Sequence, residues 1–238
     1  TILNGLMLHG GVRVFGGTFF VFSDYLKAAL RLSALQNLPV TYVFTHDSIA
    51  VGEDGPTHEP IEHLASLRTI PNTYVFRPAD ATEAQAAWYL SQKVNNKPTS
   101  LVLTRQNLPV LENTSFEKVS KGAYVVYETS SDFDTILIAT GSEVALAVDA
   151  ARELEKEGSK VRVVSMPSVE LFEEQSKEYK EELLPRSVRR RVSLEMGNTA
   201  LWYKYVGLDG LAIGIDNFGA SAPANKVIEE YGFTVAKV

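Results

Sequence analysis

The chain has 238 residues and a hydrophobic fraction of 45%, which is enough for one large domain or two small domains with real cores. It contains no cysteine, which excludes a disulfide framework and thiolate catalysis. Its formal net charge of −6 and the absence of a long basic run argue against nucleic-acid binding. No apolar run approaches the roughly 18 residues that a membrane helix needs, and no signal peptide is evident. We therefore expect a cytoplasmic protein with no membrane partner.

The first segment of the chain is typical of the end of a helix. Residues 1–9 have this character, and Gly10 with Gly11 would stop the helix. Because a domain rarely starts in this way, and because the chain does not begin with methionine, we expect a fragment or a chain whose earlier residues are missing.

Short apolar β-type runs then alternate with helical patterns along the chain. In the first half, strands are predicted over 41–44, 74–76 and 101–103, and helices over 25–35, 59–68 and 81–93. Asp80 and Glu83 have the spacing of a capping box for the third of these helices. Residues 111–121 are polar and aperiodic, and we interpret them as a linker.

The second half restarts with a predicted strand at 123–127. It continues with strand 135–139, helix 143–156 and strand 160–165, then with strands 191–195 and 211–215 and a closing helix at 224–231. The basic residues at 186 and 189–191 are interpreted as a solvated segment that leads into a strand. The alternation as a whole predicts an α/β fold with two open, mainly parallel sheets flanked by helices.

Polar residues follow three of the predicted strands, in the runs THDS at 45–48, RPAD at 77–80 and TRQN at 104–107. In an open parallel sheet these ends share one edge, where His46, Arg77 and Arg105 would suit an anionic ligand such as a phosphate. For Arg77 we favour a structural ion pair, for example with Asp80. For His46 and Arg105 the structural and the binding interpretations are balanced.

The densest cluster of unusual residues is the run GEDGPTHEP at 52–60. Its glycines and prolines predict a rigid loop that delivers Asp54 and His58 to the start of a helix, with Thr57 as the N-cap. A carboxylate and a neutral histidine at a helix N-terminus could bind hydroxyl groups and stabilise an oxyanion. A capped loop with solvated side chains is about equally consistent with these residues alone.

Two pairs of residues four apart could also contribute to a zinc site. His58 with Glu62, or Glu59 with His63, could be joined by His46. Such pairs arise often by chance, so we expect no metal site within this chain.

An aromatic cluster precedes the first long predicted helix. The run TFFVFSDY at 18–25 places Phe19, Phe22 and Tyr25 at intervals of three, roughly on one helix face. Core packing is the more common reason for such a run, and a stacking platform for a planar ring is the alternative. The turn TGS at 140–142 could likewise bind an anion at a helix N-terminus, although strand-to-helix turns often use these residues for geometry alone.

Taken together, these segments resemble those of transketolases. The match includes THDSI at 45–49 and VGEDGPTHEP at 51–60, the aromatic run at 19–25 and TRQN at 104–107. Four further runs match the C-terminal domain of that family: IATGSE at 138–143, VSMP at 164–167, YVGL at 205–208 and FGASAP at 218–223. The resemblance covers the whole chain. Deoxyxylulose-phosphate synthase shares DGPTH but lacks the histidine-aspartate-serine context, whereas dihydroxyacetone synthase is a closer alternative.

The resemblance implies a pyrimidine-binding domain over 1–118, incomplete at its N-terminus, and a C-terminal domain over 119–238. The family's diphosphate-binding domain, with its metal motif, would lie upstream, as would the glutamate that activates the cofactor. The implied cofactors are thiamine diphosphate and a Mg²⁺ or Ca²⁺ ion that the missing domain would bind. We therefore expect the 238-residue chain alone to be inactive.

The resemblance also implies roles for seven residues. These are Phe19, Phe22 and Tyr25 for holding the aminopyrimidine ring, His46 and Arg105 for binding the terminal phosphate of a sugar, Asp54 for contacting a substrate hydroxyl, and His58 as a catalytic residue that hydrogen-bonds near the reacting carbonyl oxygen.

The implied reaction moves a two-carbon ketol unit from a ketose phosphate to an aldose phosphate, as in the pentose phosphate pathway. A homodimer is implied as well, with the active site between its subunits. The alternative is a non-catalytic fragment, or one subunit of a split enzyme, that serves as a binding or assembly module. Because the motif residues are intact, we favour the catalytic interpretation.

Overall fold

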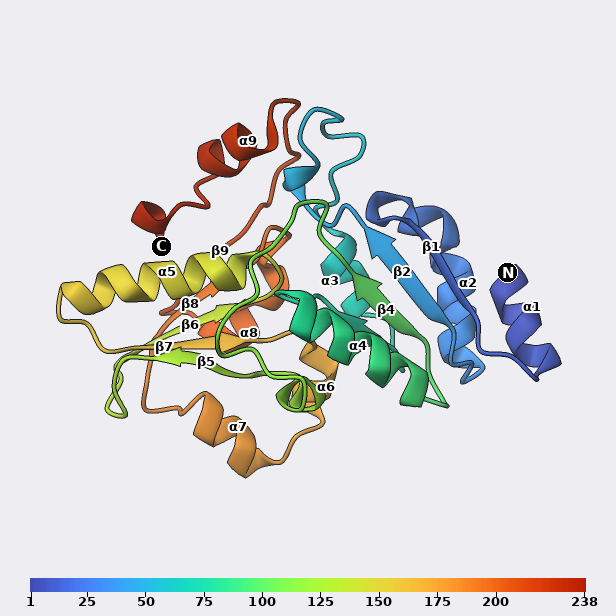
Figure 1. Cartoon of the computed structure of the whole chain (residues 1–238), viewed down its shortest axis with the longest axis horizontal. Helices are drawn as coiled ribbons and strands as arrows, with labels where there is room; N and C mark the ends of the chain where they lie inside the picture. Colours follow the sequence, from blue (N-terminus) through green and yellow to red (C-terminus); the bar gives the residue numbers. More distant parts are fainter.

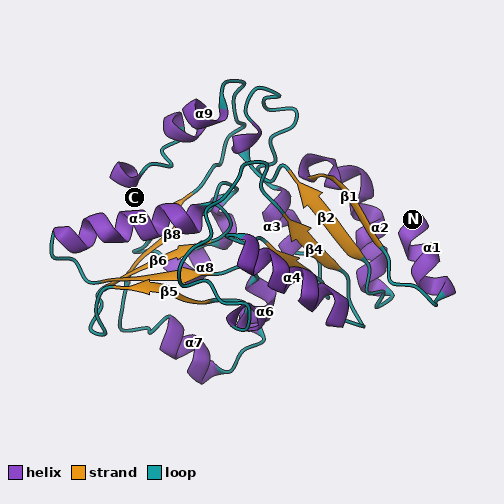
Figure 2. Cartoon of the chain, viewed as in Figure 1, coloured by secondary structure: helices purple, strands orange, loops and turns teal.

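Two α/β units lie side by side in the computed structural model, which describes all residues from 1 to 238 (Figure 1). The first unit is built on a four-stranded sheet and the second on a five-stranded sheet, and helices flank both (Figure 2). This arrangement confirms the predicted fold class. No helix combines the length and the apolar character that crossing a lipid bilayer requires.

The sheet of the first unit has the strand order β1-β2-β4-β3 and is parallel throughout. Its strands are β1 (Phe15–Phe19), β2 (Thr41–Thr45), β3 (Tyr74–Phe76) and β4 (Thr99–Val102). Strand β1 was not predicted, because Gly16 and Gly17 weaken the local β signal. Pairing with β2 holds it in place, and a Cβ atom on Gly17 would lie only 3.3 Å from the Val43 carbonyl oxygen.

Four α-helices belong to the first unit: α1 (Ile2–His9), α2 (Ser23–Leu35), α3 (His63–Arg68) and α4 (Ala81–Lys93). Helices α2 and α3 pack on one face of the sheet through buried residues such as Leu30 and Leu67, and α4 packs on the other face. Asp80 caps α4 as predicted, since its Oδ1 atom accepts a hydrogen bond of 2.9 Å from Glu83 N. The Glu83 carboxylate accepts from Ala79 N rather than from Asp80 N.

The sheet of the second unit has the order β5-β7-β6-β8-β9, in which only β5 runs antiparallel. Its strands are β5 (Tyr124–Glu128), β6 (Thr135–Ala139), β7 (Val161–Ser165), β8 (Arg190–Leu194) and β9 (Leu211–Ile213). Its helices are α5 (Glu143–Lys156), α6 (Val169–Glu173), α7 (Lys177–Leu183), α8 (Tyr203–Val206) and α9 (Ala224–Glu230). Helices α6, α7 and α8 were not predicted, because segments this short show no clear helical period.

Five 3₁₀ helices complete the chain: η1 (Phe20–Phe22), η2 (Ile49–Val51), η3 (Lys118–Lys121), η4 (Thr199–Leu201) and η5 (Val235–Lys237). Helix η3 lies between the two sheets in the sequence, close to the predicted boundary at 118/119, which stays a prediction.

Alternate residues of β6 pack on opposite faces of the second sheet. Leu137 and Ala139 belong to the core that α4 and α5 cover, whereas Ile136 and Ile138 pack with residues of α6, α7 and α8. Figure 1 shows the same division, with α5 along one face of the sheet and α7 along the other.

Apolar clusters cross the boundary between the two units. One cluster joins Phe76 of the first unit to Tyr124 of the second, and another joins Ile49 to Ile215. Interfaces of this kind hold domains in a fixed relation, because separating them would expose apolar area to water.

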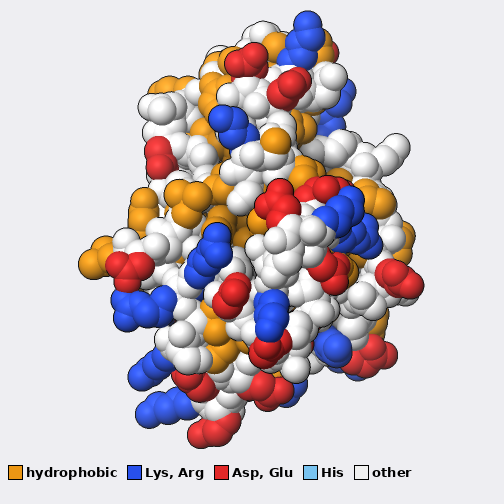
Figure 3. Space-filling view, turned by 90° about the vertical axis from the view of Figure 1, so that its left-hand side faces the viewer, with side chains coloured by type: hydrophobic (Ala, Val, Ile, Leu, Met, Phe, Trp, Pro, Cys, Tyr) orange, Lys and Arg blue, Asp and Glu red, His pale blue; other side chains and the backbone are white.

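The outer surface of the molecule carries mixed charge. On the face that Figure 3 shows, acidic and basic side chains are interspersed rather than grouped by sign. Of the basic residues at 186 and 189–191, the first three are exposed as expected, with Arg189 paired to Asp209 and Arg186 lying 3.6 Å from Glu181. Arg191 corrects the expectation, because it is half-buried and donates to four backbone carbonyl oxygens.

Candidate active site

The carboxyl ends of β1, β2 and β4 lie along one edge of the first sheet. Phe19 ends β1 and pairs in register with Thr45, the last residue of β2, while Phe44 pairs with Val102 at the end of β4. The polar runs that follow these strands therefore emerge side by side, as the sequence predicted.

Five aromatic side chains form a continuous array at this edge, which we call the aromatic platform: Phe19, Phe22, Tyr25, His46 and His58. The His46 ring stacks on Phe19 with centroids 3.7 Å apart, and Phe22 lies parallel to Phe19 at 6.2 Å. His58 meets Phe22 edge-on at 5.6 Å. The platform thus joins the three predicted ring-binding residues to the predicted phosphate-binding and catalytic histidines.

The three ring-binding candidates do not share one helix face, which corrects the sequence interpretation. Phe19 is the last residue of β1, Phe22 ends η1 and Tyr25 lies in the first turn of α2. Their proximity comes from the chain turning through η1 directly after the strand. Tyr25 is 88% exposed, so the outer end of the platform is open to a ligand.

His46 has a backbone conformation that few residues other than glycine adopt. Its φ is 62°, and its Nδ1 atom lies 3.0 Å from Thr45 Oγ1. Burial lowers the pKa of His46, and the Arg105 cation lowers it further, against an opposing effect of Asp54 and Asp47. The His46 ring is therefore mostly neutral near pH 7. Arg105 and Asp54, which are both exposed, lie near enough to the ring to change its pKa.

The loop at 52–60 differs from the predicted capped helix start. Helix α3 begins at His63, not near Glu59, and Thr57 does not cap it. Instead Thr57 Oγ1 lies 2.9 Å from His58 Nδ1. A hydroxyl that donates to Nδ1 leaves the ring proton on Nε2, where it can donate to a developing oxyanion.

The second unit supports this loop from behind. Ser221 Oγ donates a 2.6 Å hydrogen bond to the Glu53 carbonyl oxygen. Gly55, with a φ of 71°, fits against Ser221, since a Cβ atom there would lie 2.9 Å from Ser221 Cβ. A Cβ atom on Gly219 would likewise collide with Glu59 Oε2. The run at 218–223 that resembles the C-terminal domain thus shapes the loop that carries Asp54 and His58.

Glu59 is a buried carboxylate whose oxygens accept no hydrogen bond of good geometry, although the backbone N–H groups of Gly52 and Ala220 lie near them. Burial raises the pKa of Glu59 from its ordinary value of 4.5 to about 7, although the backbone N–H groups of Gly52 and Ala220 oppose the rise. The folded chain therefore holds a proton on Glu59 that the unfolded chain releases at lower pH.

This burial predicts a specific pH dependence of stability. Between pH 4.5 and about 7 the folded state binds more protons at Glu59 than the unfolded state, so the free energy of unfolding falls as the pH rises. Glu59→Gln removes the titrating carboxyl group, so the free energy of unfolding of the variant should not show this decrease with rising pH. The variant should gain about 1–3 kcal/mol relative to the wild type between pH 5 and pH 8, measured by urea unfolding. The exposed neighbour substitution Glu62→Gln is the control, and an equal pH response of both variants would contradict the prediction.

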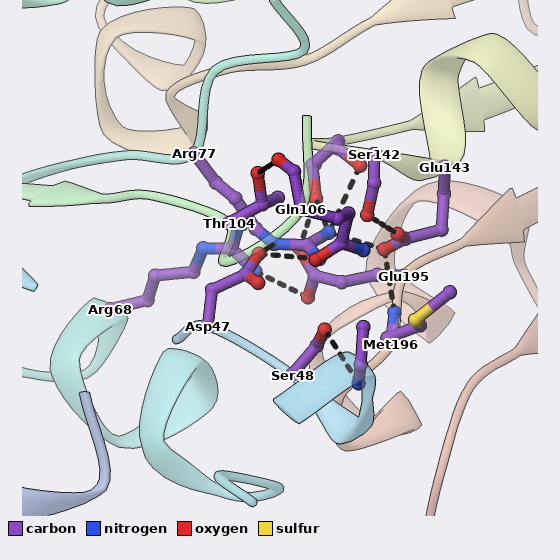
Figure 4. Close-up of polar contacts among 12 residues, drawn as sticks. Asp47, Ser48, Arg68, Arg77, Thr104, Gln106, Ser142, Glu143, Glu195 and Met196 are labelled. Atoms are coloured by element: carbon purple, nitrogen blue, oxygen red, sulfur yellow. Dashed lines mark hydrogen bonds and ion pairs between the residues drawn. The ribbon is translucent and has the colours of Figure 1, made fainter. Parts of the chain in front are cut away.

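Arg77 is a structural residue, as favoured, but its partner is not Asp80. Its side chain is fully buried, and its Nη2 atom lies 2.8 Å from Asp47 Oδ2. Its Nη1 atom donates to Thr140 Oγ1 at 2.9 Å and pairs with Glu143 of the second unit (Figure 4). Burial alone would lower the pKa of Arg77, but Glu143 and Asp47 together raise it, so the guanidinium remains charged.

The turn at 140–142 serves this network rather than an external anion. Thr140 Oγ1 donates to Glu195 Oε2 at 2.6 Å, and Glu195 accepts a bidentate pair of hydrogen bonds from Arg68 (Figure 4). Gly141 leaves room for Arg77, since a Cβ atom there would lie 2.6 Å from its Cζ atom. Of the three residues at this edge that could bind an anion, only His46 and Arg105 remain for a ligand.

Neither of the two residue pairs considered for a zinc site, His58 with Glu62 or Glu59 with His63, lies with His46 in a group that could hold a cation. The chain holds one group of three residues that could converge on a cation, namely Asp24, Glu62 and His63. In it His63 Nε2 lies 3.3 Å from Asp24 Oδ2, and His63 Nδ1 lies 3.8 Å from Glu62 Oε2. The two carboxylates face different nitrogens of the ring of this buried histidine.

Sequence reasoning missed two residues that shape the site, Glu59 and Glu143. Both lie within the motif runs at 51–60 and 138–143, and both are acidic residues at predicted helix starts, where exposure is the ordinary expectation. The available signals were two glycines that lie against these groups in the folded chain. Gly219 packs against Glu59, and Gly141 packs against Arg77.

Comparisons with known proteins agree with this architecture. Residues 1–110 match the family described as "Transketolase, pyrimidine binding domain", and residues 122–234 match "Transketolase-like TK C-terminal domain". A protein of Streptococcus pneumoniae named probable transketolase is 72% identical over 235 residues, which cover 99% of this chain and 36% of that protein.

Solved structures agree as well. A transketolase of Pichia stipitis in complex with sedoheptulose 7-phosphate matches with a TM-score of 0.94 and 46% identity, over 99% of this chain and 34% of that one. A split-gene transketolase, described as an inactive β4 tetramer, matches with a TM-score of 0.82 and 26% identity, over 99% of this chain and 77% of that one. With both of its α/β units matched and its strand-end motifs brought to one edge, this chain belongs to the transketolase family.

Proposed function

We propose that this chain forms part of a thiamine-diphosphate-dependent transketolase, which transfers a two-carbon ketol unit between sugar phosphates. The observation that carries the proposal is the aromatic platform, in which ring-stacking side chains lie in direct contact with His46 and His58. The chain spans about a third of the length of the relative from Streptococcus pneumoniae, at 36%. The activity is therefore proposed for a longer enzyme that contains this chain.

The residues at the platform fit a planar heterocycle. Phe19 and Phe22 present parallel rings, and exposed Tyr25 extends the apolar surface beyond them. Each such contact can contribute about 0.5–1.5 kcal/mol beyond area burial. Thiamine diphosphate would supply a nucleophilic carbon and an electron sink for cleavage of a carbon–carbon bond.

The chain's own residues then orient the substrate. Arg105 and neutral His46 would bind the terminal phosphate, and Asp54 would accept a hydrogen bond from a substrate hydroxyl. His58, oriented by Thr57, would donate from Nε2 to the substrate oxygen on which negative charge develops. The packing of the second unit behind the 52–60 loop keeps these groups in place.

The remaining features of the proposal follow the family. We propose Mg²⁺ or Ca²⁺ as the accompanying ion, bound outside this chain, and a cytoplasmic homodimer whose subunits share the site. The ligand named for the Pichia stipitis structure, sedoheptulose 7-phosphate, supports a sugar phosphate as substrate and a role in the pentose phosphate pathway.

A second candidate is a split subunit that assembles without catalysing the reaction by itself. The structural match to a split-gene transketolase chain is the observation behind this candidate. The intact residues of the aromatic platform support a catalytic role for the assembled enzyme, whether this chain is part of a longer polypeptide or one subunit of a split enzyme. Both kinds of enzyme need these side chains at the site.

The phosphate assignment can be tested on the longer enzyme. A charged hydrogen bond to phosphate contributes about 1.5–3 kcal/mol, so Arg105→Ala should lower kcat/KM for sugar phosphates about tenfold to a hundredfold. Most of the loss should appear in KM, because the phosphate is remote from the breaking bond. Steady-state kinetics with phosphorylated and unphosphorylated substrates measure both effects.

Two controls sharpen this test. Hydroxypyruvate with glycolaldehyde, neither of which carries a phosphate, should react almost normally. His46→Ala should show the same selectivity with a smaller loss, since a neutral imidazole forms a weaker bond. If hydroxypyruvate turnover falls as far as that of the sugar phosphate, the phosphate-binding role of Arg105 is wrong.

A further inference from the structure

We infer that the C-terminal domain, which is the second α/β unit, positions the phosphate-binding edge of the site through one buried chain of ion pairs that runs from Glu143 through Arg77 to Asp47. The inference rests on the function proposed above and assigns a role to a domain that supplies no side chain to the proposed ligand-binding set. Glu143 and Arg77 are then positioning residues, and His46 is the group through which they act.

The first step is the backbone of His46. With a φ of 62°, it lies in the left-handed region, where a residue with a Cβ atom is strained. A conformation of this kind persists only where neighbouring contacts enforce it. The stacking of the His46 ring on Phe19 is one such contact, and the next residue, Asp47, provides the other.

The second step is the attachment of Asp47. Its side chain is 1% exposed, and its Oδ2 atom accepts a hydrogen bond from Arg77 Nε at 2.9 Å. Arg77 Nη2 lies 2.8 Å from the same oxygen in an ion pair. The other oxygen of Asp47 has no partner. The guanidinium of Arg77 therefore sets the position of the Asp47 carboxylate, which has no other hydrogen-bond donor.

The third step is the anchoring of Arg77 in the C-terminal domain. Its Nη1 atom donates to the Thr140 carbonyl oxygen at 3.0 Å and to Thr140 Oγ1 at 2.9 Å, and it pairs with Glu143 (Figure 4). Glu143 Oε2 in turn accepts from Met196 N at 2.8 Å. Arg77 N also donates to the Pro167 carbonyl oxygen at 2.8 Å, so both backbone and side chain are fixed by the second unit.

A guanidinium is a rigid planar fork, so its two ends cannot move independently. Because Glu143 and Thr140 hold one side of the fork, they set the place of Asp47 on the other side. A misplacement of about 1 Å at a binding group is enough to lower catalytic efficiency strongly. The buried chain therefore links the fold of the C-terminal domain to the place of the His46 ring.

The experiment uses Glu143→Gln in the full-length enzyme loaded with thiamine diphosphate. This change keeps the shape of the side chain and removes the charge that holds Arg77. We expect KM for a ketose phosphate to rise about tenfold, because a charged hydrogen bond is weakened, while kcat stays within about twofold. KM for hydroxypyruvate, with glycolaldehyde as acceptor, should not change.

A matched control separates positioning from general support by the domain interface. Tyr124 Oη donates to Glu83 Oε1 at 2.7 Å, which is another buried polar contact between the two units, and it lies outside the Asp47 chain. Tyr124→Phe should lower stability without raising KM for the ketose phosphate. An equal rise in KM in both variants would overturn the inference.

A double-mutant cycle tests the route through His46. In a His46→Ala background, Glu143→Gln should raise KM for the ketose phosphate by less than about twofold, since the group it acts through is gone. A full tenfold rise in that background would overturn the inference. Should Glu143→Gln fail to fold, Thr140→Val, which removes one hydrogen bond to Arg77, carries the same comparison with an expected rise of about threefold.

Failure of the proposed function would look different from failure of this inference. An enzyme that shows no ketol transfer with thiamine diphosphate in its wild-type form would overturn the function and, with it, the inference. An active wild type whose Glu143→Gln variant loses hydroxypyruvate and ketose phosphate turnover equally would overturn the inference alone.

Discussion

Arg77→Met should lower the free energy of unfolding of the chain by about 3–5 kcal/mol, because it leaves two buried carboxylates without their cation. Asp47 and Glu143 are 1% and 0% exposed, and both pair with Arg77. Burial raises the pKa of Glu143 even with Arg77 opposing it, which shows how costly the ionised form is at this place. Urea unfolding at neutral pH, followed by far-UV circular dichroism, measures the loss.

The control is Arg152→Met, which removes an exposed ion pair. Arg152 Nη1 lies 3.1 Å from Asp149 Oδ1, and both side chains are more than half exposed. Pairs of this kind contribute about 0–1 kcal/mol, so this variant should remain close to the wild type. Similar losses in the two variants would mean that the buried network adds nothing beyond ordinary surface pairing.

His58→Ala in the full-length enzyme should lower kcat about 100-fold to 1,000-fold, the usual effect of removing one donor to a developing oxyanion. KM should change little, because this hydrogen bond strengthens only as charge develops on the substrate oxygen. Hydroxypyruvate is the appropriate donor for the measurement, since it carries no phosphate and so avoids any contribution from the phosphate-binding roles proposed for His46 and Arg105.

Thr57→Val provides the matched variant for this prediction. It keeps His58 and its contact with Phe22 but removes the hydroxyl that lies 2.9 Å from His58 Nδ1. The tautomer that donates from Nε2 is then less favoured, and kcat should fall by about threefold to tenfold. If His58→Ala raises KM and leaves kcat unchanged, His58 only binds substrate, and the catalytic role is wrong.

Local sequence patterns determined most of the sheet and its edge. The β-type runs at 41–44 and 74–76 lie within or match β2 and β3, and the helix predicted at 81–93 matches α4. Because the strands are parallel, the polar runs after β2, β3 and β4 were bound to meet at one edge. The grouping of His46 and Arg105 could therefore be predicted from the sequence.

Tertiary structure decided what each polar residue at that edge does. His46, Arg77 and Arg105 all follow the carboxyl ends of their strands, yet only Arg77 is buried, where it pairs with Glu143, 66 residues further along the chain. Glu59 was expected at the start of a helix, but packing of the run around Gly219 buries it instead. Strand β1 needed its partner β2 before two glycines could take part in a sheet.

The physical reason is the range of each interaction. Periodicity and capping act within a few residues and leave their trace in the sequence, whereas the partner of a buried charge is chosen by groups that only the folded chain brings together. Phe19, Phe22 and Tyr25 illustrate both what the sequence shows and what only the folded chain decides. Their spacing was visible in the sequence, but a strand, a 3₁₀ turn and a helix, rather than one helix face, place their rings in a single platform.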